Sequence, residues 1–186
     1  MATAPRKTST AARKTTATKT TRAAAQPDAI ALLRADHKRV SDLFAQYETT
    51  RSAARKKTLV ATICQELTIH AQIEEEIFYP AVKAALKDKE LVPEAQVEHQ
   101  SLKDLIAQVK DKEPDGEMFD AKIKVMSEYV KHHVKEEQNE MFVRAKKTRL
   151  DLQQLGEQLA ARKQELMDDP SQLEGSPARE PVETFA

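Results

Sequence analysis

The chain has 186 residues, with 30 basic and 30 acidic side chains, 40% hydrophobic residues, 4% aromatic residues and only three glycines. This composition is typical of a water-soluble, helix-rich protein of one domain and argues against an all-β fold, while the balanced charge excludes a protein that is basic overall. The single cysteine, Cys64, excludes an internal disulfide and a Cys-x-x-Cys metal site, which suits a reducing cytoplasm.

The first 27 residues form a basic segment that we expect to be a disordered tail. They contain no Leu, Ile, Phe or Val and no acidic residue, so they have no apolar face to bury. Three roles remain open: a solubilising tail, weak contact with nucleic acid through charge attraction, and organelle targeting. No apolar run in the chain is long enough for a membrane span or a secretory signal, so we expect a cytoplasmic protein with no membrane partner. The basic residues are Arg6, Lys7, Arg13, Lys14, Lys19 and Arg22.

Helical periodicity begins at Asp28 and predicts two helices before residue 88. A histidine replaces an apolar residue on the inward face of the first helix, and a histidine and a glutamate do so in the second. The first inward face consists of Ile30, Leu33, His37, Val40, Phe44 and Tyr47. The second, in a helix over about residues 51–88, consists of Leu59, Ile63, Leu67, His70, Glu74, Ile77 and Ala81.

Two further helices follow, one over about residues 93–112 and one after the turn signal at residues 113–116. Their inward faces again include histidines. In the fourth helix His133 is in phase with the apolar residues and with Glu137, whereas His132 is rotated by about 100° and should face outward. The third inward face consists of Val92, Ala95, His99, Leu102, Ile106 and Val109. The fourth consists of Phe119, Ile123, Met126, Val130, His133, Glu137 and Met141.

Short connections near residues 49–52, 88–92 and 112–117 predict an all-α fold, an up-down-up-down antiparallel four-helix bundle over residues 28–147. We expect an extra C-terminal helix over residues 148–168, with Thr148 as its N-cap. Its apolar side would consist of Leu150, Leu152, Leu155 and Leu159. Pro and Gly from residue 170 onward end it, and residues 169–186 should form a second disordered tail.

The polar residues on the inward faces form a duplicated set. Asp36-His37 recurs 62 residues later as Glu98-His99, and His70-x-x-x-Glu74 recurs 63 residues later as His133-x-x-x-Glu137. A histidine four residues before a glutamate lies on the same face of a helix, so each motif can supply one nitrogen and one oxygen to a shared ion. A buried His–Glu hydrogen-bond network is the alternative. The duplicated order, with such groups on all four helices, favours metal.

The candidate ligands are His37, His70, Glu74, His99, His133 and Glu137. Imidazole and carboxylate without thiolate suit iron, manganese or zinc, and six protein ligands exceed the four of a structural zinc site. If both glutamates bridge, these side chains offer about eight bonds, against roughly twelve for two octahedral ions. A bridging oxygen and one or two open positions would complete the site.

The order of these residues on four consecutive helices resembles the hemerythrin-like, HHE cation-binding family over about residues 28–147. The strings that carry the resemblance are His70-Ala-Gln-Ile-Glu-Glu-Glu-Ile-Phe-Tyr-Pro80 and His132-His133-Val-Lys-Glu-Glu-Gln-Asn-Glu-Met-Phe142, together with Asp36-His37 and Glu98-His99. The resemblance implies two non-haem iron ions, oxo- or hydroxo-bridged, in a four-helix bundle. Such a centre binds or reacts with dioxygen, or responds to oxygen, peroxide, nitric oxide or iron.

One position departs from the oxygen carriers of that family. They have a further histidine one turn after the ligand on the third helix, and this chain has Lys103 there. The departure favours redox or sensing roles over reversible oxygen carriage. Three functions therefore remain: a di-iron protein that binds or senses small oxidants, which leads; a peroxide-consuming, catalase-like enzyme; and a nucleic-acid-associated protein that uses residues 1–27.

Residues beside the candidate ligands carry weaker expectations. We expect a solvated acidic face, formed by Glu75, Glu76, Glu136 and Glu140, with contact to the ligand side chains as the alternative. Tyr129, one turn before His133, should pack in the core. Asp36 and Glu98 precede ligand histidines, so each either orients an imidazole ring or faces solvent, and the spacing does not decide between these roles.

Overall fold

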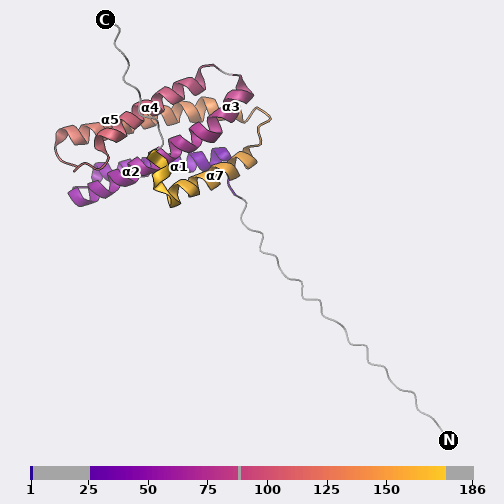
Figure 1. Ribbon diagram of the computed structural model, residues 1–186, viewed down its shortest axis with the longest axis horizontal. Helices are drawn as coiled ribbons and strands as arrows, with labels where there is room; N and C mark the ends of the chain where they lie inside the picture. The colour runs from indigo at the N-terminus through magenta and orange to yellow at the C-terminus, as the bar shows by residue number, and fades with distance from the viewer. Residues whose placement is uncertain (2–25, 88, 175–186) are drawn as a thin grey trace.

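Four long helical rods run antiparallel in the computed structural model, which describes residue 1, residues 26–87 and residues 89–174 (Figure 1). The rods are α1 (Ala29–Thr49); α2 (Ala53–Ile73), continued by the π-turn η1 (Glu74–Phe78) and by α3 (Tyr79–Leu86); α4 (Leu91–Val109); and α5 (Glu117–Glu136), continued by the π-turn η2 (Glu137–Met141) and by α6 (Phe142–Ala145). A further helix, α7 (Leu152–Asp168), is followed by a short 3-10 helix, η3 (Pro170–Glu174). The predicted up-down-up-down bundle with an extra C-terminal helix is confirmed.

Local sequence signals start the helices where the short connections require it. The Asp28 carboxylate accepts a hydrogen bond from the Ala31 amide at 2.8 Å, and the Ser52 hydroxyl accepts one from the Arg55 amide at 3.3 Å. These caps satisfy amides that have no partner within the helix. Gly116, just before α5, has a φ of 81°, a value that favours glycine. The turns therefore need few residues, and consecutive rods pack side by side.

Each of the two candidate ligand glutamates begins a π-turn. The Tyr79 amide donates to the Glu74 carbonyl, and the Phe142 amide donates to the Glu137 carbonyl, five residues back in both cases. The duplicated motif in the sequence is thus also a duplicated backbone feature. Single π-turns inside α-helices occur frequently at functional sites.

The first π-turn corrects one prediction. A turn with one extra residue rotates everything that follows relative to an ideal helix, by about 100°. Ile77 and Ala81, predicted to face the core, are therefore only partly buried, whereas Phe78 and Val82 are fully buried in their place. The other predicted inward residues of the four rods are all buried.

The apolar core has two halves, separated by a layer of histidines and glutamates. Large side chains that are fully buried in this way contribute about 1.5–3 kcal/mol each. One half contains Ile30, Leu33, Ile69, Ile73, Phe78, Tyr79, Val82, Met141, Phe142, Leu159 and Leu166. The other contains Val40, Phe44, Tyr47, Leu59, Ile63, Cys64, Leu67, Leu102, Ile106, Val109, Ile123, Met126 and Val130. Tyr129, expected in the core, is instead 48% exposed, because it lies on the outer side of α5.

Helix α7 lies against α1, α2 and η1 and covers one side of the bundle (Figure 1). Its N-cap is Asp151, whose carboxylate accepts from the Gln154 amide at 2.9 Å, and not Thr148 as the sequence predicted. Thr148 instead donates to the carbonyl of Ala145 and so ends the preceding turn. Leu159 and Leu166 anchor α7 in the core.

Gly156 brings α7 unusually close to the start of α1. A Cβ atom built there would lie 2.4 Å from the carbonyl oxygen of Pro27 and 2.7 Å from the amide nitrogen of Ala29. Both are backbone atoms, which cannot swing aside as a side chain can. The contact therefore requires glycine.

The predicted tails fall almost entirely outside the described residues. The basic segment, residues 1–27, lies there except for residues 1, 26 and 27, and the predicted C-terminal tail does so from residue 175. Within the part of the chain that the structure does describe, no helix combines the length and the apolar character needed to cross a membrane.

Candidate metal centre

The structure brings the six predicted residues together in the middle of the bundle. Each rod contributes one histidine, and the two rods with π-turns add one glutamate each at the first residue of the π-turn. All are buried, with 6% exposure or less. They are His37 from α1, His70 from α2 with Glu74 from η1, His99 from α4, and His133 from α5 with Glu137 from η2.

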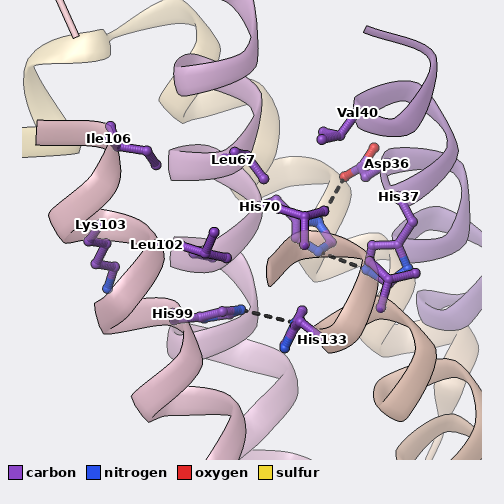
Figure 2. Close-up of a pocket in the computed structure, with 13 residues that line it drawn as sticks. Asp36, His37, Val40, Leu67, His70, His99, Leu102, Lys103, Ile106 and His133 are labelled. Atoms are coloured by element: carbon purple, nitrogen blue, oxygen red, sulfur yellow. Dashed lines mark hydrogen bonds and ion pairs between the residues drawn. The ribbon is translucent and has the colours of Figure 1, made fainter. Parts of the chain in front are cut away.

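The four imidazole rings point their Nε2 atoms toward one another (Figure 2). The Nε2 atoms of His37 and His70 are 3.0 Å apart, and those of His99 and His133 are 3.2 Å apart. Such a pair is stable only if one nitrogen donates a proton to the other, or if a cation lies between or beside two lone pairs.

The outer nitrogens of His99 and His133 show which nitrogen of each ring is left for a metal ion. His99 Nδ1 lies 3.0 Å from a Glu75 oxygen, and His133 Nδ1 lies 2.8 Å from a Glu98 oxygen. An ionised carboxylate can only accept, so both Nδ1 atoms carry their proton. With Nδ1 protonated, Nε2 is the nitrogen of each ring that can offer a lone pair inward. This arrangement fits a bound metal ion.

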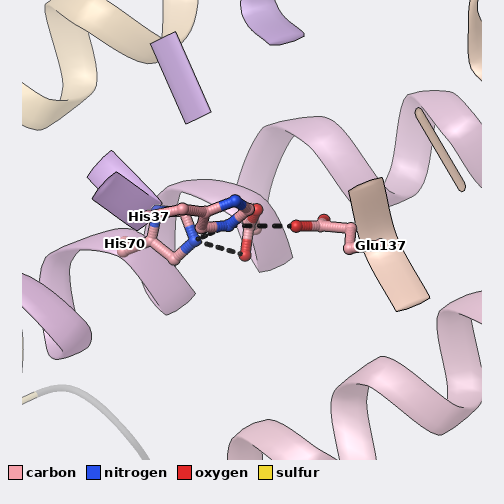
Figure 3. A group of neighbouring side chains, drawn as sticks. His37, His70 and Glu137 are labelled. Atoms are coloured by element: carbon pink, nitrogen blue, oxygen red, sulfur yellow. Dashed lines mark hydrogen bonds and ion pairs between the residues drawn. The ribbon is translucent and has the colours of Figure 1, made fainter. Parts of the chain in front are cut away.

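The two glutamates complete two adjacent groups of donor atoms. Glu74 Oε2 lies 3.3 Å from His70 Nε2 and 3.4 Å from His99 Nε2, so it faces both pairs of histidines. Glu137 Oε2 lies 3.2 Å from His37 Nε2 (Figure 3). One group of atoms within 4.8 Å of one another comes from His37, His70, Glu74 and Glu137; the other comes from Glu74, His99 and His133.

Glu74 thus belongs to both groups, whereas Glu137 belongs to the first group. The second oxygen of each carboxylate, Oε1, is buried and has no hydrogen-bond partner among the described residues. An orphaned carboxylate oxygen in a protein interior costs about 1–3 kcal/mol or more. A cation beside each glutamate would remove this cost, so the residues present fit a pair of metal ions.

The electrostatics of the metal-free protein also favour bound cations. Burial, reinforced by the charge of Glu137, holds the pKa of Glu74 well above its usual range. Burial opposes ionisation of Glu137 too, but the hydrogen bond from His37 and the charges of the neighbouring histidines lower its pKa to about 2. Burial and mutual repulsion thus favour one proton shared between the two carboxylates, which metal ions would displace.

Further side chains contact the outer nitrogens, Nδ1, of the four histidines. Besides Glu75 and Glu98, Gln138 faces His37 Nδ1 at 3.0 Å, and an Asp36 carboxylate oxygen lies 3.7 Å from His70 Nδ1. In each case the partner comes from a different helical rod from its histidine. Such outer contacts fix ring orientation and tautomer at metal sites.

One of these outer side chains corrects the expectation of a solvated acidic face. Glu75 does not lie on it: it contacts His99 and also accepts from the Lys103 ammonium at 2.7 and 2.8 Å. Lys103, at the position where oxygen-carrying hemerythrins have a further histidine, is thus held in an ion pair outside the cluster. Glu76, Glu136 and Glu140 do have the partial or full exposure that was expected.

Tyr79 is a site residue that the sequence analysis missed. It is 1% exposed, and its hydroxyl lies 3.3 Å from both Glu74 Oε2 and His99 Nε2. Burial and the charges of Glu74 and Glu137 hold the pKa of Tyr79 well above its usual range, so it remains a phenol and a potential proton donor. An ideal helix would place it one residue out of phase, and only the π-turn brings it inward.

A small cavity of about 20 Å³ lies against the four histidines, on the side of the second apolar core half (Figure 2). Its remaining wall is mostly apolar and consists of Val40, Leu67, Ala71, Leu102, Ile106, Val130 and Val134, with Asp36 and Lys103 at the edge. One water occupies about 10–15 Å³ by this kind of measure. The space therefore suits a molecule of about two heavy atoms.

His132 lies on the surface, as its helical phase predicts, with a side chain that is 63% exposed. It is 3.4 Å from Glu98 and 3.3 Å from Glu136, in a third group of potential donor atoms. These residues are exposed or partly exposed, unlike the buried groups of the centre.

The hemerythrin HHE cation-binding domain is the family whose sequence model matches the chain, over residues 28–145. The chain belongs to this family. Among solved structures, a hemerythrin HHE cation-binding domain-containing protein from Mycobacterium kansasii has the same fold, with a TM-score of 0.64 and 24% sequence identity over 75% of this chain and 86% of that one. Membership of the HHE family and the donor groups in the structure together make this a metal-binding fold.

A DNA nickase from Nostoc sp. is similar to the chain in sequence, with 27% identity over 111 residues. The match covers 60% of this HHE protein but only 31% of the nickase, so the chain spans about a third of the length of that relative.

Proposed function

We propose that this HHE protein holds two non-haem iron ions and binds or senses dioxygen or a related small oxidant such as peroxide or nitric oxide. The ligands would be His37, His70, Glu74, His99, His133 and Glu137. The observation that carries the proposal is the pair of donor groups joined by Glu74, directly beside an apolar cavity of about 20 Å³.

The chemistry of the donors supports iron. The two groups contain imidazole nitrogens and carboxylate oxygens without a thiolate, and Cys64 lies elsewhere, in the apolar core. Mixed nitrogen and oxygen ligands with open coordination positions are typical of non-haem iron sites, whereas structural zinc sites use four ligands and close them. Manganese and zinc are the alternatives that metal analysis would detect.

The iron ions would supply the electrons for binding or reducing the oxidant. The protein's own residues would do three other things. Glu75 and Glu98 hold protons on Nδ1 of His99 and His133, so that both rings present Nε2 inward. The apolar cavity admits a molecule of about two heavy atoms. The Tyr79 hydroxyl, 3.3 Å from a Glu74 oxygen, can donate a proton to a small oxidant held beside it.

Metal analysis of the purified, iron-reconstituted protein tests the proposal. We expect close to two irons per chain, with the absorption bands of a di-iron centre that change on exposure to oxygen, peroxide or nitric oxide. His70→Ala and His133→Ala should abolish both the iron and the bands. His132→Ala is the matched control, because its side chain is adjacent in sequence but exposed, and it should retain two irons. Wild-type protein that holds no iron after reconstitution would refute the proposal.

Contact with nucleic acid is a second candidate, favoured by the similarity to a DNA nickase. The basic residues 1–27 would attract phosphates through charge, and the bundle would be regulatory. Since the chain spans only 31% of the nickase, strand cleavage is not part of this candidate. Salt-dependent binding to duplex DNA that is lost on deletion of residues 1–27 would support it. Equal binding by the full-length and shortened proteins would eliminate it.

A further inference from the structure

We propose that Lys163, on α7, is a positioning residue of the metal centre that acts through Asp36 on His70. The inference rests on the proposed metal centre and adds the C-terminal helix to it. It starts from a difference among the four histidines in the distance to their Nδ1 partner. Three of them have a partner within 3.0 Å, whereas His70 Nδ1 is 3.7 Å from the Asp36 carboxylate oxygen.

Asp36 and His70 face one another with unsatisfied atoms. Asp36 Oδ2 and His70 Nδ1 are both buried, and neither has a hydrogen-bond partner among the described residues. The dashed line between the two side chains in Figure 2 marks their contact at 3.7 Å, which is longer than a hydrogen bond. The side chains are 10% and 8% exposed. For His70 to present its Nε2 lone pair to a metal, Nδ1 must carry the proton and needs an acceptor. Asp36 is the side chain placed to supply it.

Lys163 determines where the Asp36 carboxylate lies. Its ammonium donates to Asp36 Oδ1 at 2.5 Å, which leaves Oδ2 directed at His70. The pair is largely shielded from solvent, with the Lys163 side chain 18% exposed, and a Glu66 carboxylate oxygen lies 3.8 Å from the ammonium. A buried carboxylate that loses its cation is costly to keep in place. Without Lys163, Asp36 would turn toward solvent, and His70 would lose its acceptor.

The contact is also long-range: 127 residues separate Lys163 from Asp36. It exists only while α7 is docked through Leu159, Leu166 and the close approach at Gly156. Because binding free energies are reciprocal, a metal ion that selects the ordered His70 also stabilises the docked α7. Metal affinity and α7 docking should therefore rise and fall together.

Three full-length variants test the inference. Lys163→Gln removes the charge, Lys163→Arg keeps it, and Arg162→Gln is the matched control. Arg162 is the adjacent residue of α7 and pairs with Glu76 at 2.7 Å, so its replacement removes a comparable ion pair of the same helix, while the buried anchors Leu159 and Leu166 and the cation beside Asp36 stay in place. Asp36→Asn is a fourth variant, which leaves one side-chain oxygen to accept from two donors, the Lys163 ammonium and His70 Nδ1.

The readouts are iron retention against a chelator and the absorption spectrum of the loaded protein, with circular dichroism as the check on folding. We expect Lys163→Gln and Asp36→Asn to lose iron at about tenfold lower chelator concentration, as is usual when an outer partner of a ligand is removed. Lys163→Arg should recover most of the difference, and Arg162→Gln should match the wild type. Hydrogen exchange in residues 152–168 should slow on iron loading in the wild type more than in Lys163→Gln.

Three results would overturn the inference while leaving the metal centre intact: wild-type retention in Lys163→Gln, an equal loss in Arg162→Gln, or an equal loss in Lys163→Arg. The second would show that the docking of α7 matters but the ammonium does not. If the wild type itself holds no iron, the proposed function fails first, so the two failures are distinguishable.

Discussion

Replacing Glu74 by glutamine should stabilise the metal-free protein and at the same time abolish iron binding. The folded state holds a proton on Glu74 that the unfolded chain releases above its ordinary pKa of 4.5. The folded wild type therefore loses stability as pH rises from 4.5 toward the raised pKa, by about 1.4 kcal/mol for each pH unit. Glutamine has no such proton to lose, so the stability of the variant relative to the wild type should increase over the same range.

Other groups titrate in this range, but they are present in both proteins. Their contribution to the pH dependence of stability therefore cancels when the two proteins are compared. Burial lowers the pKa of His70 from 6.5 to about 4, so its contribution of about 3 kcal/mol is lost as pH falls through that window. Both proteins keep His70. The introduced amide can donate to the Glu137 carboxylate, which faces position 74, so it replaces the hydrogen bond of the protonated Glu74.

The assay is urea unfolding of the chelator-treated proteins at pH 6, 7 and 8, followed by circular dichroism. With iron in excess the order should reverse: a ligand at 100 times its dissociation constant adds about 2.7 kcal/mol to the wild type, and nothing to the variant. Glu137→Gln is the control for position: the pKa of Glu137 is lowered by its neighbours where that of Glu74 is raised, so this variant should also lose iron but should gain no stability in the metal-free state. A metal-free Glu74→Gln protein that is less stable than wild type at pH 8, or one that keeps two irons, would refute the reasoning.

Three further predictions concern other parts of the structure. Gly156→Ala should lower the free energy of unfolding. The added Cβ would lie 2.4 Å from a backbone oxygen, and this overpacking costs about 1–3 kcal/mol, more than the gain of about 1 kcal/mol in helix propensity. Urea unfolding measures the net change, and an unchanged or raised stability would contradict the close contact. Ile106→Phe should fill the cavity of about 20 Å³ and slow the reaction of the iron-loaded protein with oxygen at least tenfold without changing its iron content; stopped-flow absorption measures this rate, and an unaffected rate would show that the ligand enters elsewhere. Tyr79→Phe should retain two irons but slow any proton-dependent decay of the oxidised centre, measured as a solvent isotope effect that differs from wild type; identical isotope effects would remove Tyr79 from the chemistry.

Much of the bundle could be predicted from the sequence, since nearly every residue that helical phase placed inward is buried. The duplication led to the six candidate ligands, and phase separated His133 from His132. Phase failed after Glu74, because a π-turn has no distinct signature in composition and one extra residue is enough to exchange Ile77 for Phe78.

The partners of the outer histidine nitrogens could not be predicted either, and the reason is different. Asp36 precedes His37 in the chain but faces His70, and Glu98 precedes His99 but faces His133. Neighbours in sequence diverge on a helix, so the partner of each carboxylate depends on how adjacent rods are rotated. Lys163 is more remote still, because its role depends on where α7 docks.

The position of Glu74 between both donor groups has a consequence for how the proposed centre fills. The first ion has to displace the proton from Glu74, whereas the second ion meets a carboxylate that is already ionised and oriented. We therefore expect cooperative loading: with one equivalent of iron, the sample should consist mainly of empty and fully loaded chains, and chains with a single ion should be scarce. In a cell, such a protein would change from empty to loaded over a narrow range of iron concentration.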